Sequence, residues 1–450
     1  MHNVYAHALF TVAAAHASDG SFGCNTIRDP SLLSPLVLRV ERPNTLSTWL
    51  SSLVSTTVIS TEPPDGEYIC QDATIWRREI DESPMAGRAW IAQERFLSHR
   101  VLFFGRTQLF FGCSELRACE SYPLGCPKSI LADDIFTGGL ALLRRLNLEA
   151  GVNDKTNVSI SKIPAKELVD AWCSLVESYT TFDVKYFGDK LPAISGIAQR
   201  IAPYMSSEMG YSCGLWTGNR FNELTVRQLI WFTDVPKPRP TDVKAPSWSW
   251  ASVATPVVDP GSLDPVSMAS MAGDPTALEA SSTYFRMQCA YCVGQPKIEP
   301  EGPSLYGKVK KAVIWLSGLL IPATIKLHDM GGSWGTELVL EMRECSGSLG
   351  GFNCRLDTSD VDLSGSFVCV PMQQVYDGDG FVRLFGLILR IVKSVKGRYQ
   401  RVGMFWTIEE EFRTKLAKPI TDVEAKSAWC EKMDKSPWHP DMDRFIFHIE

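Results

Sequence analysis

The spacing of apolar residues changes along the chain and separates a mainly helical part from a part rich in strands. In residues 1–17, apolar side chains such as Val4 and Ala8 recur at helical spacing, which predicts an amphipathic helix. Two apolar runs flank a polar turn in residues 101–113, and this pattern predicts a β-hairpin. Residues 164–178 again have apolar positions three and four apart, so we expect a helix there as well.

Further helices are predicted from the same spacing over residues 84–97, 190–205 and 216–232. From about residue 284 the apolar runs become short and are separated by turn residues, which is typical of strands. The predicted strands cover residues 284–293, 309–320, 337–342, 366–372, 382–392 and 401–408. The chain is therefore predicted to be α+β. Its four expected parts are residues 1–115, a mainly helical region 116–255, a loop or linker 256–283 and a β-rich region 284–450.

Composition and charge exclude several classes of function. The net charge is −6 and the pI about 5.8, so the basic patch of a nucleic-acid-binding protein is not expected. No run reaches the roughly 18 apolar residues of a membrane span, and the first residues lack the basic start of a signal peptide. The 13 cysteines are odd in number and scattered, which favours buried thiols over a disulfide scaffold. We therefore expect a cytoplasmic protein without a membrane span or a nucleic-acid partner.

The segment 88–98, RAWIAQERFLS, is the strongest candidate for chemistry in the sequence. On a helix, Trp90 and Glu94 are four residues apart and share one face, and Gln93 lies nearby. An indole beside a carboxylate can raise the pKa of that carboxylate by removing water from it. The alternative interpretation is structural, with Trp90 in the core and Glu94 paired with a neighbouring arginine or a backbone amide.

This segment resembles a motif of the fungal heterokaryon-incompatibility (HET) domain family, written R-x-W-x-x-Q-E-R-x-L-S. The motif positions are occupied by Arg88, Trp90, Gln93 and Glu94. An arginine, an apolar run, a glycine and a second run ending in cysteine then follow in the order that the family shows. Residues 1–22 resemble a second tract of the family, M-x-x-V-Y-x-x-A, in which Tyr5 and Ala8 are motif residues.

Five further tracts that are similar to the family follow in order along the chain. They are residues 189–198 (DKLPAISGIA), 211–216 (YSCGLW), 245–252 (APSWSWAS), 386–390 (GLILR) and 399–403 (YQRVG). Their residue types point to structure more than to chemistry. The alternation in SWSW predicts a strand whose serines and tryptophans lie on opposite faces, with the tryptophans anchoring the core.

The resemblance also implies a fold for the first part of the chain. HET domains are related to the Toll/interleukin-1 receptor (TIR) fold, so residues 1–115 are expected to form a partial, TIR-like α/β HET domain. The family places two motifs, S-Y-x-W-G and W-x-D-x-x-C-I-x-Q, before the first tract, and neither occurs in this sequence. The resemblance therefore predicts that Met1 is an internal methionine of a longer domain. An inactive relic and a gene-model fragment are further interpretations of the same pattern.

The function implied by the resemblance is non-self recognition, in which HET proteins trigger growth arrest or programmed cell death. Protein partners or self-association would accompany that role. The alternative is a TIR-like enzyme that cleaves NAD, with Glu94 as the catalytic or ribose-contacting carboxylate, and NAD is implied only under this alternative. We expect no catalysis, because a domain without its first strands lacks the strand-end loops at which a nucleotide would bind.

The cysteine spacings do not predict a metal site. Cys289 and Cys292 have the spacing of half a zinc site, but no second pair of ligands lies near them in the sequence. Cys113, Cys119 and Cys126 are six and seven residues apart, which is not the spacing of a zinc knuckle. All five are therefore interpreted as ordinary thiols.

Overall fold

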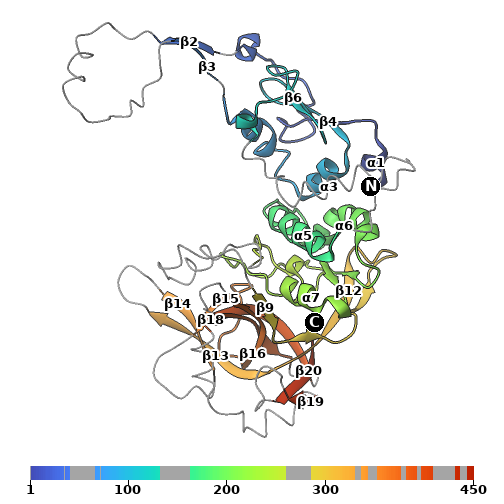
Figure 1. The fold of residues 1–450 in the computed structure, drawn as a ribbon, viewed down its shortest axis with the longest axis vertical. Helices are drawn as coiled ribbons and strands as arrows, with labels where there is room; N and C mark the ends of the chain where they lie inside the picture. Colours follow the sequence, from blue (N-terminus) through green and yellow to red (C-terminus); the bar gives the residue numbers. More distant parts are fainter. Residues whose placement is uncertain are drawn as a thin grey trace, which may run out of the picture. The chain divides into compact units, whose positions relative to one another are not determined.

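The structure of the chain is a computed structural model in which helices and sheets both occur, and this confirms the α+β class (Figure 1). It describes residues 2–34, 36–40, 66–70, 72–131, 163–259, 285–329, 336–342, 352–376, 382–392, 397–408, 431–435 and 443–450. Within these ranges, no helix combines the length and the apolar character that crossing a membrane requires. The loop predicted over residues 256–283 lies mostly outside the described residues.

Contacts divide the chain into two compact units. The larger unit comprises Met1–His7, Arg88–Leu97 and Phe136–Glu450, and the smaller unit comprises Ala8–Gly87 and Ser98–Ile135. This division differs from the expected grouping of residues 1–115, because the segment that carries the RAWIAQERFLS motif packs with the larger unit. A TIR-like domain over residues 1–115 remains a prediction.

The smaller unit is built around a four-stranded sheet in the order β1-β4-β5-β6. Its strands are β1 (Thr11–Ala13), β4 (Arg100–Phe104), β5 (Leu109–Cys113) and β6 (Arg117–Cys119). The antiparallel pair β4–β5 confirms the predicted hairpin. Trp76 anchors the core, with its ring packed edge-on against Phe103 and Phe110. A separate two-stranded antiparallel sheet pairs β2 (Leu36–Val40) with β3 (Gly66–Cys70).

The helix predicted over residues 1–17 is wrong in its second half. Helix α1 covers only His2–His7, and Thr11–Ala13 form strand β1. Strand β1 pairs in parallel with β4, so Thr11 lies opposite Val101. Pairing with a strand almost ninety residues away outweighs the local helical spacing, because tertiary contacts override weak propensities.

The described residues of the larger unit form four further α-helices, which Figure 1 shows on one side of its strands. They are α3 (Ala89–Leu97), α5 (Ala165–Thr180), α6 (Lys190–Ile201) and α7 (Asn222–Gln228). Helix α5 confirms its prediction, and its apolar stripe, including Leu168, Trp172 and Leu175, is buried. The helix expected over residues 216–232 is much shorter, because Trp216 belongs to a hairpin of β7 (Gly210–Ser212) and β8 (Leu215–Thr217).

The twelve strands of the large sheet account for most of the remaining described chain. They are β9 (Phe285–Gln288), β10 (Tyr291–Cys292), β11 (Lys297–Pro300), β12 (Val309–Gly318), β13 (Ile321–Asp329), β14 (Thr336–Met342), β15 (Phe352–Leu356), β16 (Phe367–Tyr376), β17 (Val382–Ile391), β18 (Arg398–Ile408), β19 (Glu431–Lys435) and β20 (Asp443–Ile449). Strands β18, β15, β14, β13, β16 and β17 pair in this order, and β17 pairs again with β18, so six strands close into a ring. Most of the predicted strands are thus confirmed, whereas residues 284–293 are interrupted between β9 and β10.

The alternation of side chains explains the core of this ring. In the first part of β13 alternate residues are buried, namely Ile321, Ala323 and Ile325, as expected for a strand with one face toward a core. Gly386 of β17 lies opposite Phe405 of β18. A Cβ at Gly386 would overlap the Phe405 ring and the Val370 carbonyl, so this position requires glycine.

Candidate functional site

Glu94, the candidate catalytic residue, lies on helix α3 beside helix α1 of the larger unit. Its carboxylate accepts a hydrogen bond from the Tyr5 hydroxyl. Burial raises the pKa of Glu94 above its usual value, and the Tyr5 bond and the Arg88 charge oppose that rise. Burial and the carboxylate together raise the pKa of Tyr5 to about 12. Tyr5 therefore remains protonated at neutral pH and serves as a hydrogen-bond donor to Glu94.

No pattern in the sequence connects Tyr5 with Glu94. Helical spacing predicts the Trp90 indole beside Glu94, and Trp90 is partly buried against the main core of the larger unit. Arg88 is exposed, and its positive charge lowers the pKa of Glu94. The backbone N–H of the next residue, Ala89, donates to the Asp183 carbonyl at 3.0 Å. Residues that are about ninety positions apart leave no spacing signal, so the Tyr5 partner could not be found from the sequence.

Gln93 joins helix α3 to helix α6. Its side-chain oxygen accepts a hydrogen bond of 2.6 Å from the Gly196 backbone N–H, and Gln93 is only 2% exposed. Gln93 and Gly196 belong to two of the tracts that resemble the HET family, so this bond connects those tracts directly. Ala8, the remaining motif residue, falls in the smaller unit and is partly exposed.

The tract 189–198 buries a lysine at the start of helix α6. The Lys190 amine is 1% exposed and donates a 2.7 Å hydrogen bond to the Val253 carbonyl. Burial lowers the pKa of Lys190 to about 7, because the charged form loses its hydration. The backbone carbonyl of Lys190 accepts a 2.7 Å bond from the Tyr179 hydroxyl of α5, which fixes α6 against α5.

The tract 211–216 forms the tight turn between β7 and β8. Cys213 and Gly214 both have positive φ, of 50° and 96°. The Gly214 carbonyl accepts hydrogen bonds from the indole N–H of Trp172, at 2.8 Å, and of Trp250, at 2.9 Å. Ser249 donates to the Cys213 carbonyl at 2.6 Å. One turn therefore holds side chains from helix α5 and from the tract 245–252.

The strand predicted for the SWSW sequence is wrong. Trp248 and Trp250 are both buried, yet the chain turns, and residues Trp250–Ser252 form a short 3₁₀ turn. The Ser249 hydroxyl accepts the Ala251 N–H at 3.1 Å, which caps this turn. Serine hydroxyls that bond to nearby backbone compete with strand formation, and here they direct both tryptophans into one core.

The tract 399–403 reaches the same region through a buried arginine. Arg401 and Asp357 are almost completely buried, and two guanidinium nitrogens contact the two carboxylate oxygens at 3.0 and 3.1 Å. The guanidinium carbon lies 3.5 Å from the Trp231 ring centre, and the guanidinium also donates to the Leu229 and Trp231 carbonyls. The Arg401 backbone N–H donates to the Ser247 hydroxyl at 3.0 Å.

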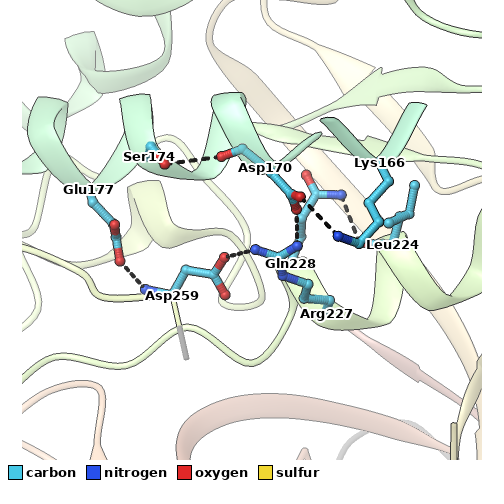
Figure 2. Close-up of polar contacts among 8 residues, drawn as sticks. All are labelled: Lys166, Asp170, Ser174, Glu177, Leu224, Arg227, Gln228 and Asp259. Atoms are coloured by element: carbon cyan, nitrogen blue, oxygen red, sulfur yellow. Dashed lines mark hydrogen bonds and ion pairs between the residues drawn. The ribbon is translucent and has the colours of Figure 1, made fainter. Parts of the chain in front are cut away.

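A second buried charge cluster lies between helices α5 and α7, where Figure 2 shows Arg227 between two carboxylates. Arg227 is 6% exposed and bonds to Asp170, and to Asp259 at 2.8 Å. The Asp259 backbone N–H donates to the Glu177 carboxylate at 2.6 Å. No sequence pattern predicts this cluster, because its arginine and carboxylates come from positions far apart in the chain.

A small cavity adjoins this cluster. It has a volume of about 20 Å³, which is room for a water molecule. Three tryptophan rings and the carboxylates of Glu177 and Asp259 contribute to its walls, and none of the HET-like motif residues 88–94 does. Both carboxylates already accept hydrogen bonds from other groups of the protein. We therefore interpret the cavity as a gap in the packing and not as a substrate site.

Across the described ranges, no group of three or more His, Cys, Asp and Glu side chains is placed to hold a metal ion. Cys289 and Cys292 are both buried, and burial raises the pKa of Cys292 to about 12. The Cys292 thiol therefore stays protonated at neutral pH. No family model, curated protein or solved structure matches the chain.

Proposed function

We propose that this chain is a signalling protein of the heterokaryon-incompatibility type, which acts in the cytoplasm in fungal non-self recognition and programmed cell death without catalysing a reaction. The resemblance of its ordered tracts supports the proposal, and one observation carries the non-catalytic part. Gln93 and Glu94, the motif side chains best suited to chemistry, are engaged within the larger unit by the Gly196 N–H and the Tyr5 hydroxyl. Because both side chains are bonded to other parts of the protein, we infer that the motif positions helices and does not carry out a reaction.

The network of tracts supports the same role. The turn at Gly214 binds Trp250, Ser247 binds Arg401, and Gln93 binds Gly196, so tracts scattered over more than three hundred residues share one core. A signalling protein without catalytic activity must transmit its signal through contacts with other proteins. The proposal therefore includes protein partners or self-association.

A second candidate function is NAD cleavage of the TIR type with Glu94 as its carboxylate. The observation that favours it is the half-buried carboxyl with a raised pKa, which is a frequent property of catalytic acids and bases. Buried structural carboxylates share this property, so the two candidates differ in whether the Glu94 charge is needed for function.

The first test expresses the full chain from an inducible promoter in a filamentous fungus and measures growth arrest. We expect arrest with the wild type and equally with Glu94→Gln, because glutamine keeps an oxygen that accepts the Tyr5 hydroxyl. Urea unfolding of the purified variant provides the control for folding. Arrest that is lost in Glu94→Gln, although the variant unfolds at the wild-type urea concentration, would refute the non-catalytic role.

The second test incubates the purified full chain with NAD and measures the release of nicotinamide. We expect no release above that in buffer, for the wild type and for Glu94→Gln alike. Release by the wild type that disappears in Glu94→Gln would establish the enzymatic alternative. The two assays are independent, since one measures a cellular response and the other a chemical reaction.

A further inference from the structure

Two cysteines of the smaller unit bring their sulfur atoms within 3.8 Å of each other. Cys119 ends strand β6, and the chain then turns back, so the Cys126 backbone N–H donates to the Arg117 carbonyl at 2.7 Å. Within the turn, Cys119 and Tyr122 exchange backbone hydrogen bonds of 3.2 and 2.9 Å. The backbone therefore holds the two thiols together in a defined geometry, although their spacing of seven residues gives no sign of it.

The surroundings of the pair separate the roles of the two sulfurs. The Cys126 thiol donates its hydrogen bond to the Cys119 sulfur, and the backbone N–H groups of Tyr122 and Ser121 lie near the same atom while they donate to the Cys119 carbonyl and the Gln108 side chain. These donors lower the pKa of Cys119 to about 7, while the same contact and burial raise the pKa of Cys126. Cys119 is thus the more acidic thiol of the pair and the one that ionises first.

We propose that Cys119 and Cys126 form a reversible disulfide when the protein meets hydrogen peroxide. The Cys119 thiolate attacks the peroxide oxygen, so that an S–O bond forms, the O–O bond breaks and the departing hydroxide leaves as water after taking a proton. The Cys126 sulfur then attacks Cys119, which forms the S–S bond and breaks the S–O bond. The hydroxyl group leaves with the Cys126 proton as a second water molecule. Two thiols are oxidised and one peroxide is reduced to two waters.

The movement required for this bond is small. A disulfide has an S–S length of about 2 Å, so the sulfurs must approach by roughly 2 Å from their present separation. Cys119 is 4% exposed but Cys126 is only partly buried, so the pair meets solvent on the Cys126 side. Cys113, the third cysteine of this part of the chain, provides a matched control. Its sulfur accepts the Leu116 N–H at 3.2 Å.

The sequence makes the disulfide simple to detect in the full chain. Trypsin cleaves after Arg117 and Lys128, and the peptide 118–128 contains Cys119 and Cys126 but no other cysteine. After graded treatment with hydrogen peroxide and alkylation of the remaining thiols, we expect this peptide to carry no alkyl group and to be lighter by two hydrogen atoms than the unalkylated reduced peptide. Dithiothreitol should restore it, and Cys113→Ser should leave the reaction unchanged. A peptide 118–128 that stays reduced while other cysteine peptides are oxidised would overturn the proposal.

Single variants test the assignment of roles. In Cys126→Ser the sulfenic acid on Cys119 has no thiol to react with, so dimedone should label Cys119. In Cys119→Ser the remaining Cys126 thiol lacks the backbone N–H groups that favour the Cys119 thiolate, so dimedone labelling of Cys126 should be weaker at neutral pH. Equal labelling in the two variants would contradict the assignment of Cys119 as the attacking thiolate. Mass spectrometry of the same peptide reports both outcomes.

Discussion

Substitution of Arg401 by methionine should destabilise the larger unit more than any surface change in it. Arg401 and Asp357 are 0% and 1% exposed, so loss of the guanidinium leaves a carboxylate in the core without its main partner. Breaking a buried ion pair in this way typically costs about 3–5 kcal/mol. Arg239 also lowers the pKa of Asp357, and its charge remains in the variant, so the lower end of this range applies.

The same geometry predicts that the double variant is less harmful than the single one. Burial raises the pKa of Asp357 and lowers that of Arg401, which means that desolvation offsets much of their attraction. Once Arg401 is gone, removing the charge of Asp357 with Asp357→Leu should restore part of the lost stability. Some loss should persist, because the Leu229 and Trp231 carbonyls still lack their donor.

The measurement is urea unfolding monitored by tryptophan fluorescence. One of the fluorescent residues is Trp231, whose ring packs against the Arg401 guanidinium. Lys310→Met provides the control, since Lys310 and Glu299 form an exposed pair at 3.8 Å whose loss should cost at most about 1 kcal/mol. A cost below about 1 kcal/mol for Arg401→Met would refute the argument from buried charge. A double variant whose cost equals the sum of the single variants would refute the argument from desolvation.

Three further predictions concern the larger unit and are tested by the same unfolding measurement. Gln93→Leu leaves the buried Gly196 N–H without its acceptor and should cost about 1–3 kcal/mol. Lys190 has a pKa of about 7 in the folded protein and its usual 10.5 in the unfolded chain. Between these pH values the unfolded chain binds more protons than the folded protein. The free energy of unfolding of the wild type should therefore rise with pH across this window. Lys190→Met should reduce this rise, and an unchanged slope would contradict it. Gly386→Ala should cost about 1–3 kcal/mol through overlap with its neighbours, whereas Gly302→Ala, where a Cβ meets nothing within 4 Å, should be neutral.

The local pattern of apolar residues predicts a helix or strand correctly where that element buries one continuous face. The stripe through Leu168 and Trp172 predicted helix α5, and runs of apolar residues between turns predicted most strands of the ring. Pattern failed where distant partners decide the conformation. Thr11–Ala13 are a strand only because β4 is available, and the serines around Trp248 form a turn because backbone groups lie within reach of their hydroxyls.

The polar contacts of the larger unit were less predictable than its elements. Arg227 pairs with Asp170 and Asp259, which are separated from it by 57 and 32 residues. Sequence spacing identifies partners only within a helix turn or along a strand, so these carboxylates could not be assigned to Arg227. The spacing of Cys119 and Cys126 likewise gives no sign that their thiols are close, because metal-ligand spacings do not reveal the turn between them.

Glu94 illustrates what helical spacing can and cannot decide. Four residues of separation place Glu94 and Trp90 on one face of a helix in any sequence, whether that face holds a substrate or another helix. The identity of the partner separates the two cases, and here the partner is Tyr5, whose pKa of about 12 keeps its hydroxyl proton at neutral pH. A permanent donor favours the charged carboxylate and opposes the rise in pKa that burial produces. The same bond therefore weakens the argument for Glu94 as an acid and strengthens the argument that it holds α1 against α3.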